Sequence, residues 1–242
     1  MNLRVTFCVV LTACLALPAA FAQDYSPSGG YVTDAMTLSV QEKAEELFQR
    51  EDYERAHLIY LKELAPIGDK YAQYMIGFMT LTGLGVREDP VLASAWYRLA
   101  AEREIAEFVA VRDDLIRRLD TVDMGRSDEI YLRLRREYSD IVVRMRKVRK
   151  DFDHLRGRST GSRIGTSHAP VIVVKPREGT SMSAVAYEYQ ARMRMQAHLN
   201  FIVKTLEVER VDADNITSSE ISALEAQVMT YVARIDDRVD DR

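Results

Sequence analysis

The chain has 242 residues, of which 47% are hydrophobic and 29% are charged, and its formal net charge is −4 at pH 7. This length and composition allow a sizeable core in one domain or in two small ones. The acidic balance, with a pI of about 5.7, argues against nucleic acid as a partner.

The first 22 residues are predicted to be a signal peptide. Arg4 supplies a positive start, residues 5–17 form an apolar run that is short for a membrane span, and residues 20–22 give a small-x-small cleavage site. Cys14 ends a Leu-Thr-Ala-Cys stretch that resembles a lipoprotein box, so lipid attachment there is the alternative. We expect a periplasmic or secreted protein.

Both cysteines, Cys8 and Cys14, lie inside this segment. The mature chain then has no thiol, which excludes disulfides, a thiolate nucleophile and a cysteine-bound metal. This usage suits an oxidising compartment. Residues 23–37 are polar and contain Gly, Ser and Pro, so we predict a flexible leader.

Residues 71–102 predict a helix, a tight loop and a second helix. Apolar residues recur at helical spacing in the first half. Gly83 and Gly85 then interrupt the pattern, where backbone angles open mainly to glycine are expected. Asp89 is placed to cap the second helix, with Pro90 at its first position.

This stretch resembles the Sel-one-like repeat, a relative of the tetratricopeptide repeat. The resemblance is carried by Ala72, Ile76, Gly77, Gly83, Gly85, Val86, Asp89, Ala93, Trp96, Tyr97, Ala100 and Ala101. A weaker match lies upstream at residues 53–69, behind an opening helix at residues 38–50. The family usually has Gly about two residues after Ala-Ala-Glu, whereas Arg103 and Glu104 follow here, so we expect no long array. The resemblance implies a short α-solenoid over residues 38–122 and a scaffold or adaptor role.

A further helix is predicted at residues 105–119, where it would cover the open end of the repeats, and residues 123–125 are expected to end it. Residues 127–156 then carry apolar side chains at alternating spacings of three and four, typical of a coiled-coil seam. The seam consists of Tyr131, Leu134, Tyr138, Ile141, Met145, Val148, Phe152 and Leu155. Either the C-terminal helices of the same chain or a second copy must cover it. We favour a monomer, with a homodimer through residues 131–155 as the alternative.

Residues 126–242 are therefore predicted to form a C-terminal helical bundle. A long Gly/Ser/Thr-rich loop at residues 157–183, with a β-prone centre, interrupts it and is either functional or disordered. Helix resumes at residue 184, and Thr217 with Glu220 forms a capping-box pattern for the last helix. The expected fold class is all-α: a short α-solenoid of helical pairs followed by a long-helix antiparallel bundle.

Charge is unevenly distributed along the chain. Residues 126–158 contain eleven basic and six acidic side chains, whereas the chain as a whole is acidic. This segment is either a face for an anionic glycan or lipid, or a solvated helix side partly paired with the acidic repeats, which we prefer.

No recognisable catalytic constellation emerges. The four histidines are scattered without a metal motif, and adjacent acids on a helix do not face each other. We therefore predict no catalytic residue, no metal and no cofactor. An unrecognised hydrolase is the third interpretation, after a protein-binding scaffold and an anion-binding envelope protein.

The first repeat helix suggests where a protein partner would bind. One of its sides carries Tyr74 and Phe78, and inner helices of solenoids line the concave surface. We hypothesise that Tyr74, Phe78 and Lys70 contact a partner, while packing of the two aromatic rings inside the protein is the alternative. The predicted function is a non-enzymatic, exported scaffold or adaptor in the cell envelope.

Overall fold

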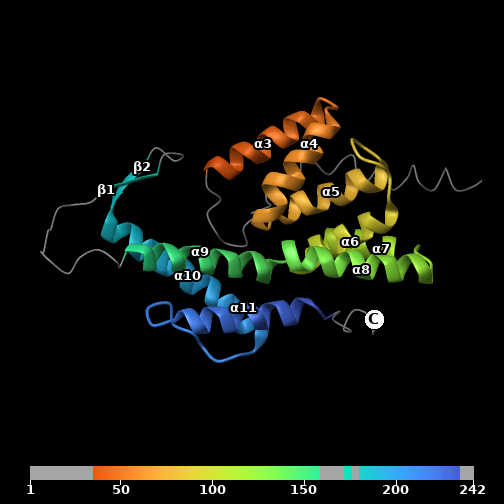
Figure 1. Ribbon diagram of the computed structural model, residues 1–242. Helices are drawn as coiled ribbons and strands as arrows, with labels where there is room; N and C mark the ends of the chain where they lie inside the picture. Colours follow the sequence, from red (N-terminus) through yellow and green to blue (C-terminus); the bar gives the residue numbers. More distant parts are fainter. Residues whose placement is uncertain (1–34, 159–171, 176–179, 235–242) are drawn as a thin grey trace, which may run out of the picture. The chain divides into compact units, whose positions relative to one another are not determined.

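The computed structural model describes residues 35–158, 172–175 and 180–234, which belong to one compact unit (Figure 1). It confirms the predicted all-helical class. The α-helices are α3 (Ala35–Gln49), α4 (Tyr53–Ile59), α5 (Lys70–Thr82), α6 (Pro90–Ala100), α7 (Ala106–Ile116), α8 (Thr121–Tyr138), α9 (Asp140–Arg158), α10 (Ala184–Leu206) and α11 (Ser218–Val232). Within these described residues, no helix combines the length and apolar character needed to cross a membrane.

Helices α5 and α6 form the predicted pair of helices joined by a tight loop. Asp69 and Asp89 cap them, each carboxylate accepting a hydrogen bond from the N–H three residues on, at 3.0 and 2.9 Å. In the loop between them, Gly83 and Gly85 adopt φ angles of +73° and +68°. Local signals therefore predicted this pair correctly.

Two glycines leave room for close packing between helices. A Cβ on Gly85 would clash with the backbone of Tyr53 and Glu54, where α4 begins. A Cβ on Gly77 would lie 3.3 Å from the ring of Tyr97 in α6. The repeat residues that form the packing side of α6 are all buried, namely Ala93, Trp96, Tyr97 and Ala100.

The upstream helix pair is also present, with an irregular end. Helix α4 continues as a π-helical turn, η1 (Tyr60–Leu64), and a 3₁₀ turn, η2 (Ala65–Ile67). Pro66 explains the irregularity, because proline lacks an N–H and its ring clashes with the carbonyl four residues earlier. The stretch ends at Gly68, whose φ is +86°.

The segment after α6 differs from the prediction. Helix α7 stops at Ile116, and Asp120 caps a new helix, α8, by accepting a hydrogen bond from the N–H of Asp123 at 2.8 Å. Residues 123–125, expected to end a helix, lie inside α8. Gly125 is tolerated there because it faces open space, and a Cβ at this position would meet no atom within 4 Å.

The predicted long helix is broken at Ser139, so the expectation of one continuous helix over residues 127–156 is wrong. Ser139 has extended backbone angles between α8 and α9. The N–H of Asp140, freed by the break, donates to Glu102 Oε2 at 3.1 Å. A contact between distant parts of the chain thus replaces local helical hydrogen bonding.

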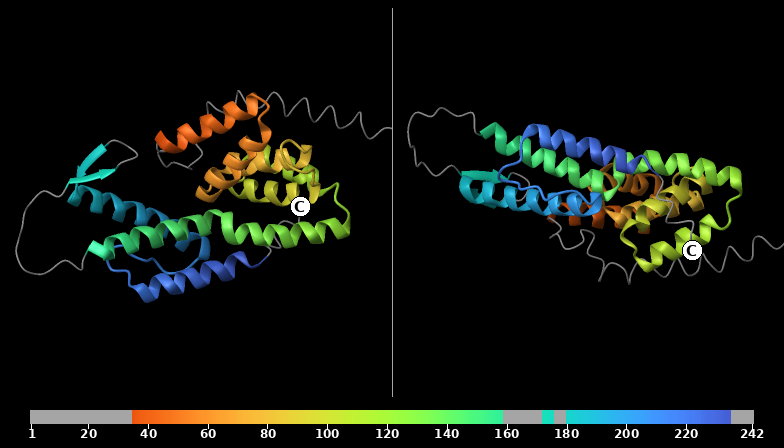
Figure 2. Two further views of the ribbon diagram at one scale, coloured as in Figure 1. Left: turned by 45° about the horizontal axis from the view of Figure 1, so that its top comes forward. Right: turned by 90° about the horizontal axis from the view of Figure 1, so that it is seen from below.

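The seam is consequently shared between two partners within the chain. Its first part lies on α8, where Tyr138 packs at 5.2 Å from Trp96 of α6. Its second part faces α10 and α11, which Figure 2 shows beside α9. The buried core of this bundle consists of Ile141, Val142, Met145, Val148, Met195, Leu199, Ile202, Ala213, Ile221, Leu224, Val228 and Val232. The preferred intramolecular packing of the second part is therefore observed.

The remaining bundle elements agree with their local signals. Thr217 and Glu220 form the predicted capping box of α11. In the long loop, β1 (Ile172–Lys175) pairs antiparallel with β2 (Thr180–Ser183), a partner that the sequence pattern did not indicate. The predicted signal peptide, residues 23–34 of the predicted leader and residues 235–242 lie outside the described residues.

Candidate functional site: a buried ionic cluster and an exposed apolar row

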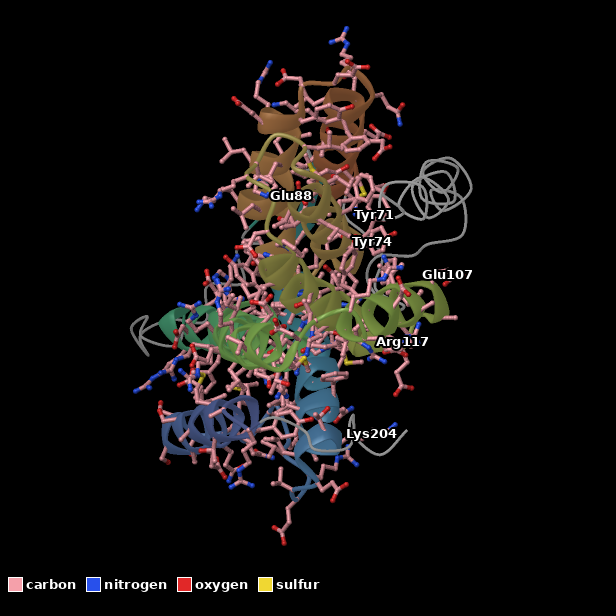
Figure 3. All side chains as sticks on the ribbon, turned by 90° about the vertical axis from the view of Figure 1, so that its right-hand side faces the viewer. Tyr71, Tyr74, Glu88, Glu107, Arg117 and Lys204 are labelled. Atoms are coloured by element: carbon pink, nitrogen blue, oxygen red, sulfur yellow. The ribbon has the colours of Figure 1, made fainter. Side chains whose placement is uncertain are left out.

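The residues predicted to bind a partner are in the interior. Lys70, Tyr74 and Phe78 are 0%, 7% and 8% exposed. Tyr74, labelled in Figure 3, lies between α5 and α7. Its ring stacks on Phe108 of α7 at 4.7 Å, and the ring of Phe78 lies 6.3 Å from that of Phe48 in α3. The prediction that these side chains line an open surface is wrong, because neighbouring helices cover the apolar sides of α5.

Lys70 is the centre of a buried ionic cluster. Its ammonium lies 2.7 Å from Glu102 Oε2 and 3.4 Å from Asp140 Oδ1. It also donates hydrogen bonds to Gln73 Oε1 and to the carbonyl of Leu99, both at 3.0 Å. A buried charge is tolerated only when it is paired and hydrogen-bonded in this way.

Arg103 completes the cluster. Its Nε and Nη2 donate to the two carboxylate oxygens of Asp140, at 2.7 and 2.9 Å, in a bidentate pair. Nη2 also donates to the carbonyl of Gly68 at 3.0 Å. The cluster therefore joins three residues of the repeat region, Lys70, Glu102 and Arg103, to the first residue of α9.

The electrostatics keep this junction ionised. Burial disfavours the charged form of Asp140, but Lys70 and Arg103 outweigh burial and hold the pKa of that carboxyl below its usual value. Burial instead raises the pKa of Asp69, although Gln41 and the N–H of Ala72 donate hydrogen bonds to it. Because the Lys70 side chain is fully enclosed, we interpret the cluster as a structural lock rather than a reaction centre.

Two exposed cations of residues 126–158 bind backbone carbonyls of the same chain. Arg146 Nη2 and Lys147 Nζ donate to the carbonyls of Pro66 and Ile67, both at 3.4 Å. They thereby bind the negative C-terminal end of the helical stretch formed by α4, η1 and η2. These contacts agree with the preferred interpretation of the basic segment as a solvated and internally bonded face.

His198 is buried among positive charges. It is 5% exposed, and Arg144 Nη1 lies 3.5 Å from its Nδ1. Burial and the charges of Lys147, Arg144 and Arg194 lower the pKa of His198 to about 4, so the ring is neutral at pH 7. Across the described parts of the chain, no three His, Cys, Asp or Glu side chains are grouped to hold a metal ion.

An exposed apolar row runs along the first half of α10. We call it the α10 row: Val185, Tyr189 and Met193, which are 78%, 64% and 55% exposed. Their spacing of four residues places them on one side of the helix, next to the buried stripe. The sequence analysis did not single out these three residues, because the pattern alone does not show which side of the helix is covered.

No protein-family model, curated protein or solved structure matches this chain. Function must therefore be inferred from the chain's own surfaces. The ionic cluster fixes how the helices are joined, and the α10 row is the exposed feature most suited to binding.

Proposed function

We propose that this chain is a non-enzymatic scaffold or adaptor that acts by protein–protein interaction in the cell envelope. The observation that carries the proposal is the α10 row. Large apolar side chains that are more than half exposed and aligned on one helix mark an interaction surface more often than a solvated one.

The row fits an amphipathic helix of a partner protein. Side chains at a spacing of four residues form a ridge that packs into the groove of a second helix. Complete burial of a Val or Met side chain is worth about 1.5–3 kcal/mol, and Tyr adds a ring with a polar tip, a combination favoured at interfaces. Three such residues suit a reversible contact.

The ionic cluster supports the same role. It ties α9 to the repeat helices, and α9 in turn packs along α10. A surface held on rigid elements loses little conformational entropy when a partner binds. The repeats then act as a platform for α10, which differs from the partner-lining role that the resemblance implied for them.

A crosslinking pull-down from the cell envelope tests this function. The tagged triple variant V185S/Y189S/M193S should no longer capture a partner protein that the wild type captures. Its melting temperature should be unchanged, because these three side chains are exposed. Matched controls are V122S on α8 and M229S on α11, which remove apolar residues that are 73% and 44% exposed elsewhere. Equal capture by all variants would refute the α10 row as the binding surface.

Export is part of the proposal and has its own test. Mass spectrometry of the protein from its host should show a mature chain that begins at Gln23. A lipid-modified chain that begins at Cys14 would support the lipoprotein alternative and membrane anchoring. A chain that retains Met1 would contradict export.

The second candidate is contact with an anionic glycan or lipid. It rests on Arg133, Arg136 and Lys150, which are exposed and form no ion pair with any described residue. Such binding to anionic vesicles should weaken steeply between low and physiological salt. Substituting these three residues with Gln should abolish it, and salt-independent partner capture would instead favour the adaptor.

A further inference from the structure

Three cations meet at the end of the helical stretch formed by α4, η1 and η2. Each donates a hydrogen bond to one of three consecutive backbone carbonyls, those of residues 66–68. The cations are Arg103, Arg146 and Lys147. The last two are neighbours on α9, so their side chains leave the helix in different directions, yet their charged ends meet at adjacent carbonyls. A helix C-terminus carries only about half a negative charge, so this end gathers an excess of positive charge.

The carboxylate at this junction is already engaged. Asp140 accepts both hydrogen bonds of the bidentate pair with Arg103 and lies 3.4 Å from the ammonium of Lys70. Arg146 and Lys147 form no ion pair with any described residue. Their positive charges are therefore held in place by neutral carbonyls and have no counter-charge in the described chain.

Lys147 lies among like charges. Partial burial and the charges of Arg144, Arg103 and Arg146 lower the pKa of Lys147, and Asp140 opposes them. Like charges on neighbouring helical positions repel, so the arrangement is unfavourable without an anion. An added negative charge at this place would relieve the repulsion.

The two cationic ends define the chemistry of that anion. Arg146 and Lys147 are exposed, so a group in solution can reach them. Their hydrogen bonds to the carbonyls of residues 66 and 67 are long, at 3.4 Å, and an ionised oxygen is a stronger acceptor than a carbonyl. A phosphate group carries nearly two negative charges at pH 7 and several acceptor oxygens. It therefore matches a guanidinium beside an ammonium better than a single carboxylate does.

We propose that Arg146 and Lys147 form a binding site for a phosphate group, supplied by a soluble phosphate compound or by a lipid headgroup. The site lies where η2 meets α9, apart from the α10 row, and it does not depend on the adaptor function. It also differs from the exposed cations Arg133, Arg136 and Lys150, which do not converge on a common point in this way. A bound phosphate stabilises the junction between the repeats and α9, because it neutralises the excess charge there.

Side-chain NMR of the protein with inorganic phosphate tests the site directly. Sodium chloride holds the ionic strength constant, which removes a general salt effect. Phosphate should shift the ε-CH₂ signal of Lys147 in a saturable way. It should also raise the lowered pKa of Lys147 toward its ordinary value, because a bound anion favours the ammonium form.

Calorimetric titration of variants with inorganic phosphate separates the site from a general charge effect. R146Q and K147Q should each weaken binding at least about tenfold, as for a lost hydrogen bond to a charged group, whereas K147R should retain it. The matched control is R133Q/K150Q, which removes two exposed cations elsewhere and should keep the wild-type affinity. Equal weakening in the control and in K147Q would overturn the proposal.

Phosphatidylcholine vesicles with and without phosphatidic acid distinguish the two sources of the phosphate group. Saturable binding of inorganic phosphate would indicate a soluble phosphate compound. Binding only to vesicles that contain phosphatidic acid, lost in K147Q and kept in R133Q/K150Q, would indicate a lipid headgroup. A Lys147 signal that responds neither to phosphate nor to these vesicles would overturn the proposal.

Discussion

The substitution D140N tests whether the ionic cluster locks the repeats to the bundle. Asp140 accepts two hydrogen bonds from Arg103, at 2.7 and 2.9 Å, and lies 3.4 Å from the ammonium of Lys70. An Asn side chain keeps the shape but removes the charge and turns an NH₂ group toward a donor. Breaking a buried pair in this way costs about 3–5 kcal/mol, a large share of the roughly 5–15 kcal/mol that stabilises a typical domain.

Urea unfolding of D140N and of a matched surface variant measures this cost. The control is D153N, because Asp153 lies 3.9 Å from Arg149 and its side chain is 64% exposed, where a pair is worth at most about 1 kcal/mol. A D140N stability within about 0.5 kcal/mol of D153N would refute the lock. The depressed pKa of Asp140 adds a pH signature: its contribution is present above the ordinary Asp pKa of about 4 and is lost as pH falls through the lower folded value.

Four further substitutions probe the turns and the buried histidine. Glu104 has a left-handed φ of +55°, so E104G should raise stability by about 1 kcal/mol in thermal unfolding, and a loss would contradict this explanation. G85A should lower the free energy of unfolding by at least about 2 kcal/mol, because the added Cβ would clash with the backbone at the start of α4. G83A should lower it by about 1 kcal/mol, since the atom nearest to the added Cβ would be 3.5 Å away. Equal losses of stability would refute the close approach at Gly85. In the folded protein the pKa of His198 is lowered to about 4, so the folded state resists protonation of the ring. The free energy of unfolding should therefore fall by up to about 3 kcal/mol as the pH drops from 6.5 toward 4. Urea unfolding at pH 7 and 4.5 should show this fall in the wild type and not in H198Q.

Local signals predicted the α5–α6 pair because each acts within a few residues. The caps of α5 and α6 and the glycine angles between them depend on neighbouring backbone groups alone. The break at Ser139 could not be read in the same way. The seam continues across it without a slip, and the interaction that stabilises the break joins Asp140 to Glu102, 38 residues earlier.

Burial was harder to predict than helix position. Helix α5 is apolar nearly all round, which is compatible with a sticky surface or with enclosure on several sides. Only the packing of Phe108 on Tyr74, and of Phe48 near Phe78, distinguishes the two. The exposure of the α10 row was also hard to predict, because this helix carries apolar residues on its exposed side as well as on its buried side.

The second helix of the predicted pair is covered on one side. Helix α8 packs on the outer side of α6, where Ser94 Oγ lies 2.6 Å from Ser127 Oγ and Trp96 contacts Tyr138. That side of α6 is consequently occupied by α8. Helix α7, which we expected to cover the open end, buries only Phe108 and Leu115.

The residues after Ala-Ala-Glu explain the change of direction. Glu104, a residue other than glycine, adopts a left-handed φ of +55° just after Ala-Ala-Glu. The two residues before it have a different role, because Glu102 and Arg103 bind the start of α9. If the lock replaces a further repeat, then D140N should weaken the contact of α9 with the repeats while α5 and α6 remain paired. Hydrogen exchange should then rise first at the α8–α9 break and not in α5, and faster exchange throughout α5 would contradict this account.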